Sequence, residues 1–239
     1  FIVLVPEQFT MQTQKDLVSM HPRHGIMNID VLSFARLAYR VFEETGTKQM
    51  QVLDDEGKNL ILRKIAGDYE NKLTVLKGNI KKLGYISEVK SVISEFTQYD
   101  IGEEEMDEML DHLDEDSRLY YKLKDIRLLY EGFQDYLRER YITKEELLDV
   151  LNSQVKESEL LKNSVVVLDG FTGFTPVQNR LILELMRCCK EVWVTVTMDE
   201  RENPYAYKHP YQLFGLSKQM VTTLVRICLL YTSDAADEL

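Results

Sequence analysis

The sequence predicts an α/β protein whose parallel sheet is interrupted by a large all-helical insertion, and three observations lead to this prediction. Residues Val165–Leu168 are apolar at every position, which indicates a strand buried on both faces, as in a parallel sheet. Strand-like and helix-like segments alternate over residues 2–42, the pattern of βαβ units. From residue 46 to residue 163, only helical periodicity is convincing.

The first α/β segment begins with a predicted strand over residues 2–5, which Pro6 ends because proline cannot donate to a strand ladder. A polar helix follows to about Met20, and a second strand is expected over residues 26–32. Ser33 is placed to cap the next helix, whose apolar residues keep helical spacing. These residues are Phe34, Leu37, Ala38, Val41 and Phe42.

The insertion is predicted to contain helices alone, at residues 56–70, 86–99, 103–113, 117–140 and 144–157. The fourth helix carries one apolar stripe for packing on other helices: Leu119, Leu123, Ile126, Tyr130, Phe133 and Leu137. Thr143 and Glu146 form a capping box before the last helix. The acidic block from Asp100 to Asp116 indicates a solvated helix face.

The α/β pattern returns with the strand at residues 165–168, and Asp169 follows it at the edge where open α/β sheets bind ligands. Asp169 has two interpretations, a magnesium ligand as in P-loop NTPases or a strand-end carboxylate that bonds its own turn. Thr175, Pro176 and Gln178 supply the N-cap, first-position proline and capping box of the next helix. A last strand is expected over residues 191–197.

The composition is that of an ordinary soluble protein, with 44% hydrophobic and 29% charged residues. The net charge of −11 argues against coating nucleic acid by bulk electrostatics, although it leaves room for a local DNA groove. The sequence has no apolar run long enough to span a bilayer, no signal peptide and no disulfide pattern among its three cysteines. A cytoplasmic protein without membrane contact is therefore expected.

The chain ends lead to two further expectations. The chain starts at Phe1 rather than at a methionine and enters a predicted apolar strand at once, which indicates an N-terminal truncation. The residues from Cys228 to Glu238 read CLLYTSDAADE and resemble a translated sequencing adapter, so residues 228–239 are expected to be a non-native tail. The rest divides into a discontinuous α/β domain, residues 1–47 and 163–227, and a helical insertion domain, residues 48–162.

Three stretches of the sequence, taken in order, resemble a known family. They are VPEQFT at residues 5–10, VLSFARLAYRVF at residues 31–42 and LDGFTGFTPVQ at residues 168–178. Together they resemble the N-terminal helicase-like region of AddB (RexB), one of the two proteins of AddAB (RexAB) ATP-dependent helicase/deoxyribonucleases. The resemblance extends from residue 1 to about residue 227 and includes KLKDIRLLYEGFQDYL at residues 122–137.

The resemblance implies a RecA-like sheet of the P-loop NTPase type, lacking the strand and phosphate loop that would precede Phe1. It implies a parent protein that processes double-strand DNA breaks for homologous recombination, as a heterodimer with an AddA- or RexA-type partner. The parent would use ATP and magnesium. Its C-terminal nuclease domain, with an iron–sulfur cluster, would lie outside this sequence, so the chain alone is expected to be inactive as an enzyme.

By this resemblance, Asp169 matches the magnesium-binding acid of the helicase strand motif, and Gln178 matches the glutamine that closes it. The capping box explains Gln178 equally well. Active helicases place a glutamate directly after the acid to activate water, whereas this chain has Gly170. Because losing a general base typically costs about 10²- to 10⁴-fold in rate, weak ATP hydrolysis is expected.

Two loops match loops that face single-stranded DNA in related helicases. Their candidate DNA-binding residues are Gln8, Phe9, Thr10, Ser33, Phe34 and Arg36. Phe9 is placed to stack on a base, worth about 1–3 kcal/mol, and Arg36 to pair with a phosphate. For Phe9 and Phe34 the alternative is an aromatic ring packed at a strand–helix junction.

Two functions follow from these expectations. In the first, the chain is a DNA-guiding and partner-binding scaffold within a helicase–nuclease, with little motor activity of its own. In the second, it is a protein-interaction α/β module that makes no DNA contact. Salt-dependent binding of single-stranded DNA separates the two, because only phosphate contacts release counterions.

Overall fold

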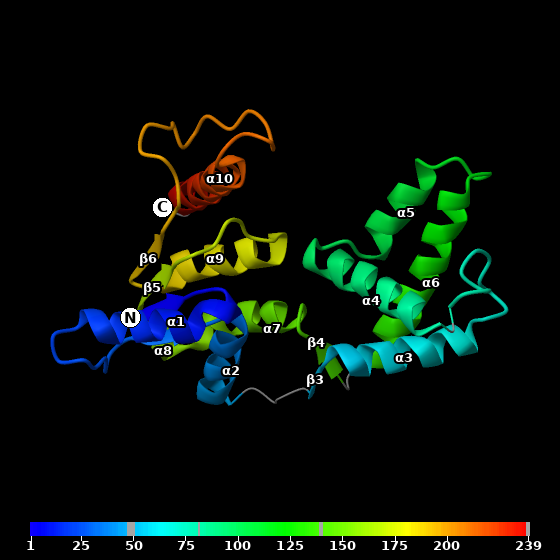
Figure 1. Cartoon of the computed structure of the whole chain (residues 1–239), viewed down its shortest axis with the longest axis horizontal. Coiled ribbons are helices and arrows are strands. Elements are labelled where there is room, and N and C mark those ends of the chain that lie inside the picture. The colour runs from blue at the N-terminus through cyan, green and yellow to red at the C-terminus, as the bar shows by residue number, and fades with distance from the viewer. Residues whose placement is uncertain (47–50, 81, 139–140, 238–239) are drawn as a thin grey trace. The chain divides into compact units, whose positions relative to one another are not determined.

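The computed structural model describes residues 1–46, 51–80, 82–138 and 141–237, and it has an α/β fold with a parallel sheet, as predicted. The chain divides into two compact units (Figure 1). Unit 1 comprises Phe1–Lys48 and Leu148–Leu239, and unit 2 comprises Gln49–Leu147. Residues 148–162 thus lie in unit 1. In the described part of the chain, no helix is long and apolar enough to cross a membrane.

Unit 1 is built on a four-stranded sheet in the order β2-β1-β5-β6. The strands are β1 (Ile2–Leu4), β2 (Asp30–Leu32), β5 (Val165–Leu168) and β6 (Glu191–Val194). Every neighbouring pair is parallel. Its helices are α1 (Thr10–Met20), α2 (Phe34–Thr45), α7 (Leu147–Gln154), α8 (Glu159–Lys162), α9 (Pro176–Cys188) and α10 (Gly215–Asp237). Two 3-10 turns, Glu7–Phe9 and Val155–Glu157, complete it.

The core of unit 1 lies against the central strands β1 and β5. Ile2, Leu4, Val166 and Leu168 are fully buried on one face of these strands. Val3, Val165 and Val167, on the other face, are partly exposed. The prediction that residues 165–168 are buried on both faces is therefore correct for one face and too strong for the other.

Two predicted helix starts of unit 1, those of α2 and α9, are confirmed. The Ser33 hydroxyl accepts a hydrogen bond from the Arg36 N–H (3.4 Å) and caps α2. At α9, the Gln178 N–H donates to the Thr175 hydroxyl (3.3 Å), and the Thr175 N–H donates to the Gln178 amide oxygen (3.0 Å). This is the capping box, and Pro176 occupies the first turn. The chain therefore leaves the sheet into α2 and α9 at points fixed by short polar side chains.

Three strands are shorter than the sequence predicts, because a strand ends where its partner ends. β1 ends at Leu4 rather than at residue 5, opposite Leu32 and Leu168. β2 begins at Asp30 rather than at residue 26, and its first residue already pairs with Ile2, the first residue of β1. β6 ends at Val194 rather than at residue 197, opposite Leu168, the last residue of β5. Strand propensity alone cannot reveal such limits, since they are set by the neighbouring strand.

The described residues of unit 2 form four helices, at positions close to those predicted, and one feature that the sequence did not predict. The helices are α3 (Asp55–Asp68), α4 (Leu83–Gln98), α5 (Glu103–Asp111) and α6 (Arg118–Leu137). The unexpected feature is a two-stranded parallel sheet of β3 (Gln51–Leu53) and β4 (Tyr141–Thr143). The prediction of an all-helical insertion is therefore wrong. Strands of three residues carry too short a pattern to be seen in a sequence.

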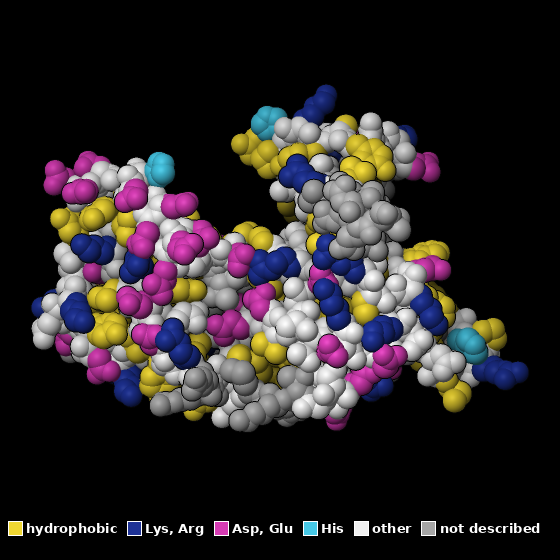
Figure 2. All heavy atoms as spheres, turned by 180° about the vertical axis from the view of Figure 1, so that it is seen from behind, with side chains coloured by type: hydrophobic (Ala, Val, Ile, Leu, Met, Phe, Trp, Pro, Cys, Tyr) yellow, Lys and Arg dark blue, Asp and Glu magenta, His cyan; other side chains and the backbone are white. Residues whose placement is uncertain are grey.

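One apolar core holds unit 2 together, formed mainly by α3, α4 and α6. The predicted stripe of α6 is buried from Leu123 to Leu137, as a helix packed on helices requires. Its first member, Leu119, is instead 58% exposed. Acidic side chains gather at the same end of the unit, around α5 (Figure 2).

Candidate nucleic-acid interface

The loops singled out in the sequence meet at one edge of the unit 1 sheet. The last residues of the four strands lie side by side, since Leu4 pairs with Leu32 and with Leu168, and Leu168 pairs with Val194. Because all strands are parallel, the segments that follow them leave the sheet at its carboxyl edge. This edge therefore carries the loops after β1, β2 and β5, which contain the predicted DNA-binding residues and Asp169.

Asp169 is fixed at this edge by both its main chain and its side chain. Its N–H donates to the Leu4 carbonyl (2.9 Å), which extends the β1–β5 ladder by one bond. Its carboxylate oxygen Oδ1 accepts the hydroxyl hydrogen of Thr195, the residue that follows β6. The side chain thus bonds a neighbouring strand end rather than its own turn, and it is partly exposed.

Gly170 adopts a left-handed backbone conformation, with φ of +75°. A β-carbon at this position would meet Pro6 Cδ at 3.7 Å, an ordinary contact, so space is not the constraint. The constraint is the backbone, because side-chain-bearing residues in this region are disfavoured by about 1–2 kcal/mol. The backbone at position 170 is therefore shaped for glycine.

A row of aromatic rings connects the loops after β2 and β5. The Phe34 ring lies 5.4 Å from the Phe171 ring, and Phe171 lies 5.1 Å from Phe174, measured between ring centroids. Phe34 is only 7% exposed, whereas Phe9 is 48% exposed. Of these two candidate DNA-binding residues, Phe9 is half exposed to solvent, whereas Phe34 is buried at the edge.

The polar candidate residues of the first two loops divide into two exposed and two buried side chains. Gln8 and Arg36 are exposed, and Arg36 Nε lies 3.9 Å from Glu7 Oε1. Thr10 is buried, and its hydroxyl donates to the Glu7 carbonyl (3.0 Å). Ser33 is buried as well and serves as the cap of α2. Gln8, Phe9 and Arg36 therefore remain the accessible members of the predicted DNA-binding set.

Thr10 does not cap a helix. α1 begins at Thr10 itself, and Phe9 stands at the N-cap without a side-chain hydrogen bond. Gln178 keeps its expected capping role through its amide oxygen. Neither side chain reaches beyond these local bonds in the described contacts.

The side chains at this edge do not form a complete metal site by themselves. In the part of the chain that the structure describes, no group of three or more His, Cys, Asp and Glu side chains is placed to hold a metal ion. Asp169 and Thr195 bring one carboxylate and one hydroxyl together. Such a pair resembles the few protein oxygens that magnesium takes when phosphates and waters fill its other positions.

A further acid near the end of β6 carries its own counter-charge. Arg201 donates to both carboxylate oxygens of Asp199, through Nε at 2.9 Å and Nη2 at 2.6 Å. These hydrogen bonds hold the pKa of Asp199 below its usual range. The repulsion that this partly exposed acid would exert on a nucleic-acid backbone is thereby reduced.

Sequence reasoning missed two partners of this region. Thr195 was expected to lie within a longer strand, and it became the partner of Asp169 because β6 ends one residue before it. Lys218 of α10 is buried and bonds Glu202, while the neighbouring Ser217 hydroxyl donates to the Thr197 carbonyl (2.9 Å). Neither contact leaves a local pattern in the sequence, since each joins residues about 16 or more positions apart.

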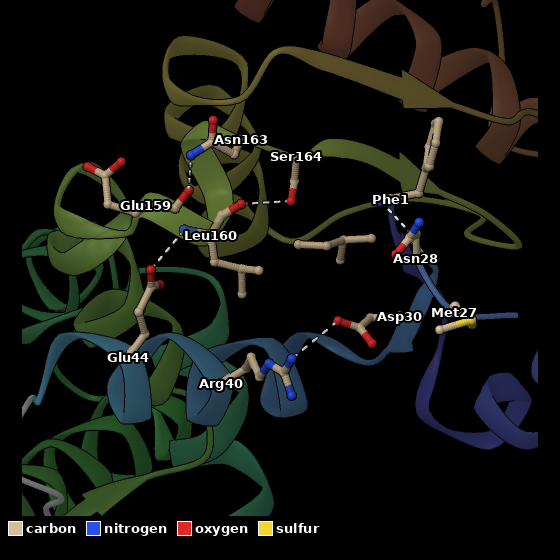
Figure 3. A pocket seen from close by; sticks show the side chains of 11 residues that line it. Phe1, Met27, Asn28, Asp30, Arg40, Glu44, Glu159, Leu160, Asn163 and Ser164 are labelled. Atoms are coloured by element: carbon tan, nitrogen blue, oxygen red, sulfur yellow. Dashed lines mark hydrogen bonds and ion pairs between the residues drawn. The ribbon is translucent and has the colours of Figure 1, made fainter.

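A pocket of about 690 Å³ lies at the opposite, amino edge of the same sheet (Figure 3). Arg40 and Glu44, one turn apart on α2, reach it, and Arg40 Nη2 lies 3.6 Å from Asp30 Oδ2. Glu44 Oε1 accepts the Leu160 N–H (2.8 Å), and its other oxygen accepts the Ser158 hydroxyl. None of the predicted site residues lines this pocket.

Comparison with known proteins is consistent with the three motifs. The family described as "ADDB, N-terminal" matches residues 1–235. A protein of Lachnoclostridium phytofermentans, named as the B component of an "ATP-dependent helicase/deoxyribonuclease", is 46% identical over 230 residues, covering 96% of this chain and 20% of that protein. Proteins of the same name from Alkaliphilus oremlandii and Caldanaerobacter subterraneus are 39% and 33% identical over 197 and 227 residues, covering 82% and 95% of this chain.

The chain spans only about one fifth of the length of these relatives, 20%, 17% and 19% in turn. The match nevertheless covers nearly all of the chain, including both units and the carboxyl-edge loops. On this basis the chain belongs to the AddB family and corresponds to its N-terminal region.

Proposed function

We propose that this chain is the helicase-like part of an AddB protein of a helicase/deoxyribonuclease and guides single-stranded DNA across the carboxyl edge of its sheet. The relatives' names motivate the substrate class. The observation that carries the proposal is the convergence of Gln8, Phe9 and Arg36, all exposed, at that edge. An aromatic ring and a guanidinium together are the pair that single-stranded DNA binders use for bases and phosphates.

The proposal extends to the whole AddB protein. Its sheet is RecA-like, and the protein works with an AddA-type partner on double-strand breaks during recombination, in the bacterial cytoplasm where the chromosome lies. Asp169 would supply one oxygen ligand to magnesium bound with ATP, which neutralises phosphate charge. Hydrolysis there is weak, because the left-handed Gly170 stands where a general base would act. The iron–sulfur cluster belongs to the remainder of the AddB protein.

Anisotropy of a labelled oligonucleotide tests the proposal. An oligo-dT of about 20 nucleotides exceeds the usual site of about 4–16 nucleotides, and its affinity for the chain is measured over a range of salt concentrations. Arg36→Ala should weaken binding about fivefold, roughly the 1 kcal/mol of one exposed charge contact. It should also lower the slope of log K against log salt by about 0.7, the value for one phosphate of a single strand.

Arg40→Ala is the matched control. Arg40 lies one turn further along α2, and its side chain is 53% exposed, against 59% for Arg36. Its substitution removes the same charge, but the Arg40 side chain reaches the amino-edge pocket instead of the carboxyl edge. Arg40→Ala should leave affinity and slope unchanged. Equal effects of the two substitutions would mean that bulk charge, not this edge, attracts DNA.

The second function, a protein-interaction module without DNA contact, is favoured by the net charge of −11. It predicts that the chain binds no single-stranded DNA at any salt concentration. The same titration therefore decides between the two functions, since only the first produces a salt-dependent signal.

A further inference from the structure

An apolar groove opens on unit 2 among α4, α5 and α6. Its volume is about 740 Å³, which lies within the range of about 300–1,000 Å³ typical of binding pockets. Three large apolar side chains in its lining are exposed to solvent: Tyr99, Met109 and Leu119. Exposed apolar residues that are contiguous, rather than scattered, mark interaction surfaces.

The groove continues the core of the unit. The stripe of α6 is buried at Leu123 and Ile126, which form part of the groove floor, and it reaches solvent at Leu119, one turn earlier. The apolar surface that packs α6 on its neighbours therefore runs on into the open groove. A further helix laid there would extend the same ridge-and-groove packing.

One face of α5 forms a wall of the groove. Glu105, Glu108, Met109 and His112 all line it, at positions i, i+3, i+4 and i+7 of a helix. Met109 thus stands in the groove with carboxylates beside it along the helix. Methionine packs adaptably against varied apolar partners, which suits a docking surface.

The charge of the lining is negative. Asp100, Glu105 and Glu108 contribute three acids against the single lysine Lys122, a net of 1 − 3 = −2 with His112 neutral. The surrounding block from Asp100 to Asp116 contains ten acidic residues and neither lysine nor arginine. Figure 2 shows acidic side chains gathered beside hydrophobic ones at this end of the unit.

Part of the acidic block is compensated inside the chain, away from the groove. Arg127 lies 3.6 Å from Glu103, 2.5 Å from Asp107 and 3.7 Å from Glu131, and these contacts raise the pKa of its guanidinium, chiefly through the hydrogen bond to Asp107. None of these four residues lines the groove. The lining itself carries more acids than lysines, and a basic partner would match this excess of negative charge.

We propose that this groove binds an amphipathic helix of a protein partner, with its apolar face in the groove and flanking Lys or Arg side chains on the acidic wall. Helix-in-groove binding through residues at i, i+3, i+4 and i+7 is a recurring mode of recognition, and basic flanks fit the charge of this lining. The inference uses unit 2 alone and does not depend on the DNA-guiding function.

A model peptide tests the proposal. A labelled helix of about 18 residues, five turns long, carries leucines on one face and lysines on the other, and its anisotropy is measured with the 239-residue chain. Leu119→Gln should weaken binding about tenfold, as expected for losing a buried leucine contact. Leu60→Gln, at an exposed leucine of α3 outside the lining, should leave the affinity within about twofold.

Charge is tested with a second matched pair. Glu108→Gln and Glu115→Gln remove the same charge from the acidic block, but only Glu108 lines the groove. Glu108→Gln should weaken binding by about two- to threefold and Glu115→Gln by less. A peptide with glutamates in place of the lysines should bind at least about tenfold more weakly.

Several outcomes would overturn the proposal. Equal effects of Leu119→Gln and Leu60→Gln, or equal binding of the glutamate peptide, would show that the groove does not select this helix. Self-association of the chain that Leu119→Gln abolishes would identify a second copy as the occupant. Circular dichroism confirms that each variant is folded, and Met109→Gln is the second groove variant if Leu119→Gln unfolds.

Discussion

Replacing Asp125 with alanine should destabilise unit 2 more than any surface change. Asp125 is buried on α6, and its carboxylate accepts hydrogen bonds from three consecutive N–H groups. The Thr74 N–H reaches both oxygens, at 2.9 and 3.0 Å, while the Val75 and Leu76 N–H groups reach Oδ2 at 2.7 and 2.8 Å. The turn between α3 and α4 is therefore organised around one carboxylate.

The magnitude follows from the burial of those donors. An unsatisfied buried N–H costs about 1–3 kcal/mol. The bond to Leu76 is buried, so its full penalty applies, whereas those to Thr74 and Val75 are partly buried and admit water. A total of about 3–5 kcal/mol results, similar to the loss of one partner of a buried charge pair. Asp125→Asn keeps one acceptor oxygen and should lose about half as much.

Urea unfolding followed by circular dichroism measures the loss. With a slope of about 2 kcal/mol/M, a loss of about 4 kcal/mol lowers the unfolding midpoint of unit 2 by about 2 M. Asp135→Ala is the control, because Asp135 lies on the same helix but pairs with Arg138 at 3.3 Å on the surface, and it should change stability by less than about 0.5 kcal/mol. A loss below about 1 kcal/mol for Asp125→Ala would refute the reasoning and show that apolar contacts alone hold the turn.

Two further predictions concern unit 1. Gly170→Ala should destabilise the fold by about 1 kcal/mol in the same urea assay, because the backbone at Gly170 is left-handed. Gly173→Ala, where no atom lies within 4 Å of the added carbon, should be neutral or slightly stabilising. Equal effects of the two substitutions would disprove the backbone explanation. Burial raises the pKa of the Cys189 thiol to about 12, so its thiolate is scarce at about pH 8. Iodoacetamide should therefore label the exposed Cys228 first and Cys189 only on unfolding or as the pH rises towards about 12, and rapid labelling of Cys189 in the folded chain near neutral pH would contradict this.

Local chemistry made the sheet and its helix starts predictable. The apolar run at β5 and the capping box at Thr175 act over three or four residues, so the sequence displays them directly. The predicted Thr143–Glu146 pair also forms its two hydrogen bonds, but α7 begins at Leu147 rather than at residue 144. The convergence of the loops at the carboxyl edge also follows from parallel pairing, once the strands are assigned. DNA binding at that edge stays a prediction.

The features that the sequence did not predict depend on contacts between residues far apart in the chain. β3 and β4 were missed because each becomes a strand only in the presence of the other. Phe34 and Phe9 are alike in sequence, both apolar residues near a strand–helix junction, yet Phe34 packs on Phe171 and Phe9 does not share that row. Leu119 fits the apolar stripe of α6, but helical spacing alone cannot show that neighbouring helices leave this residue exposed.

The pairing of β3 with β4 also constrains the order in which unit 2 folds. Gln51 pairs with Tyr141, a separation of 141 − 51 = 90 residues, and only three residue pairs form the ladder. Closing a flexible loop of that length costs about 4 kcal/mol by the logarithmic rule, more than so short a ladder returns. We therefore expect the β3–β4 sheet to form only after α3, α4 and α6 have packed, because their packing shortens the loop that must be closed. The amide hydrogens of this sheet should be among the last in unit 2 to gain protection from hydrogen exchange during refolding. They should be among the first to lose that protection during unfolding.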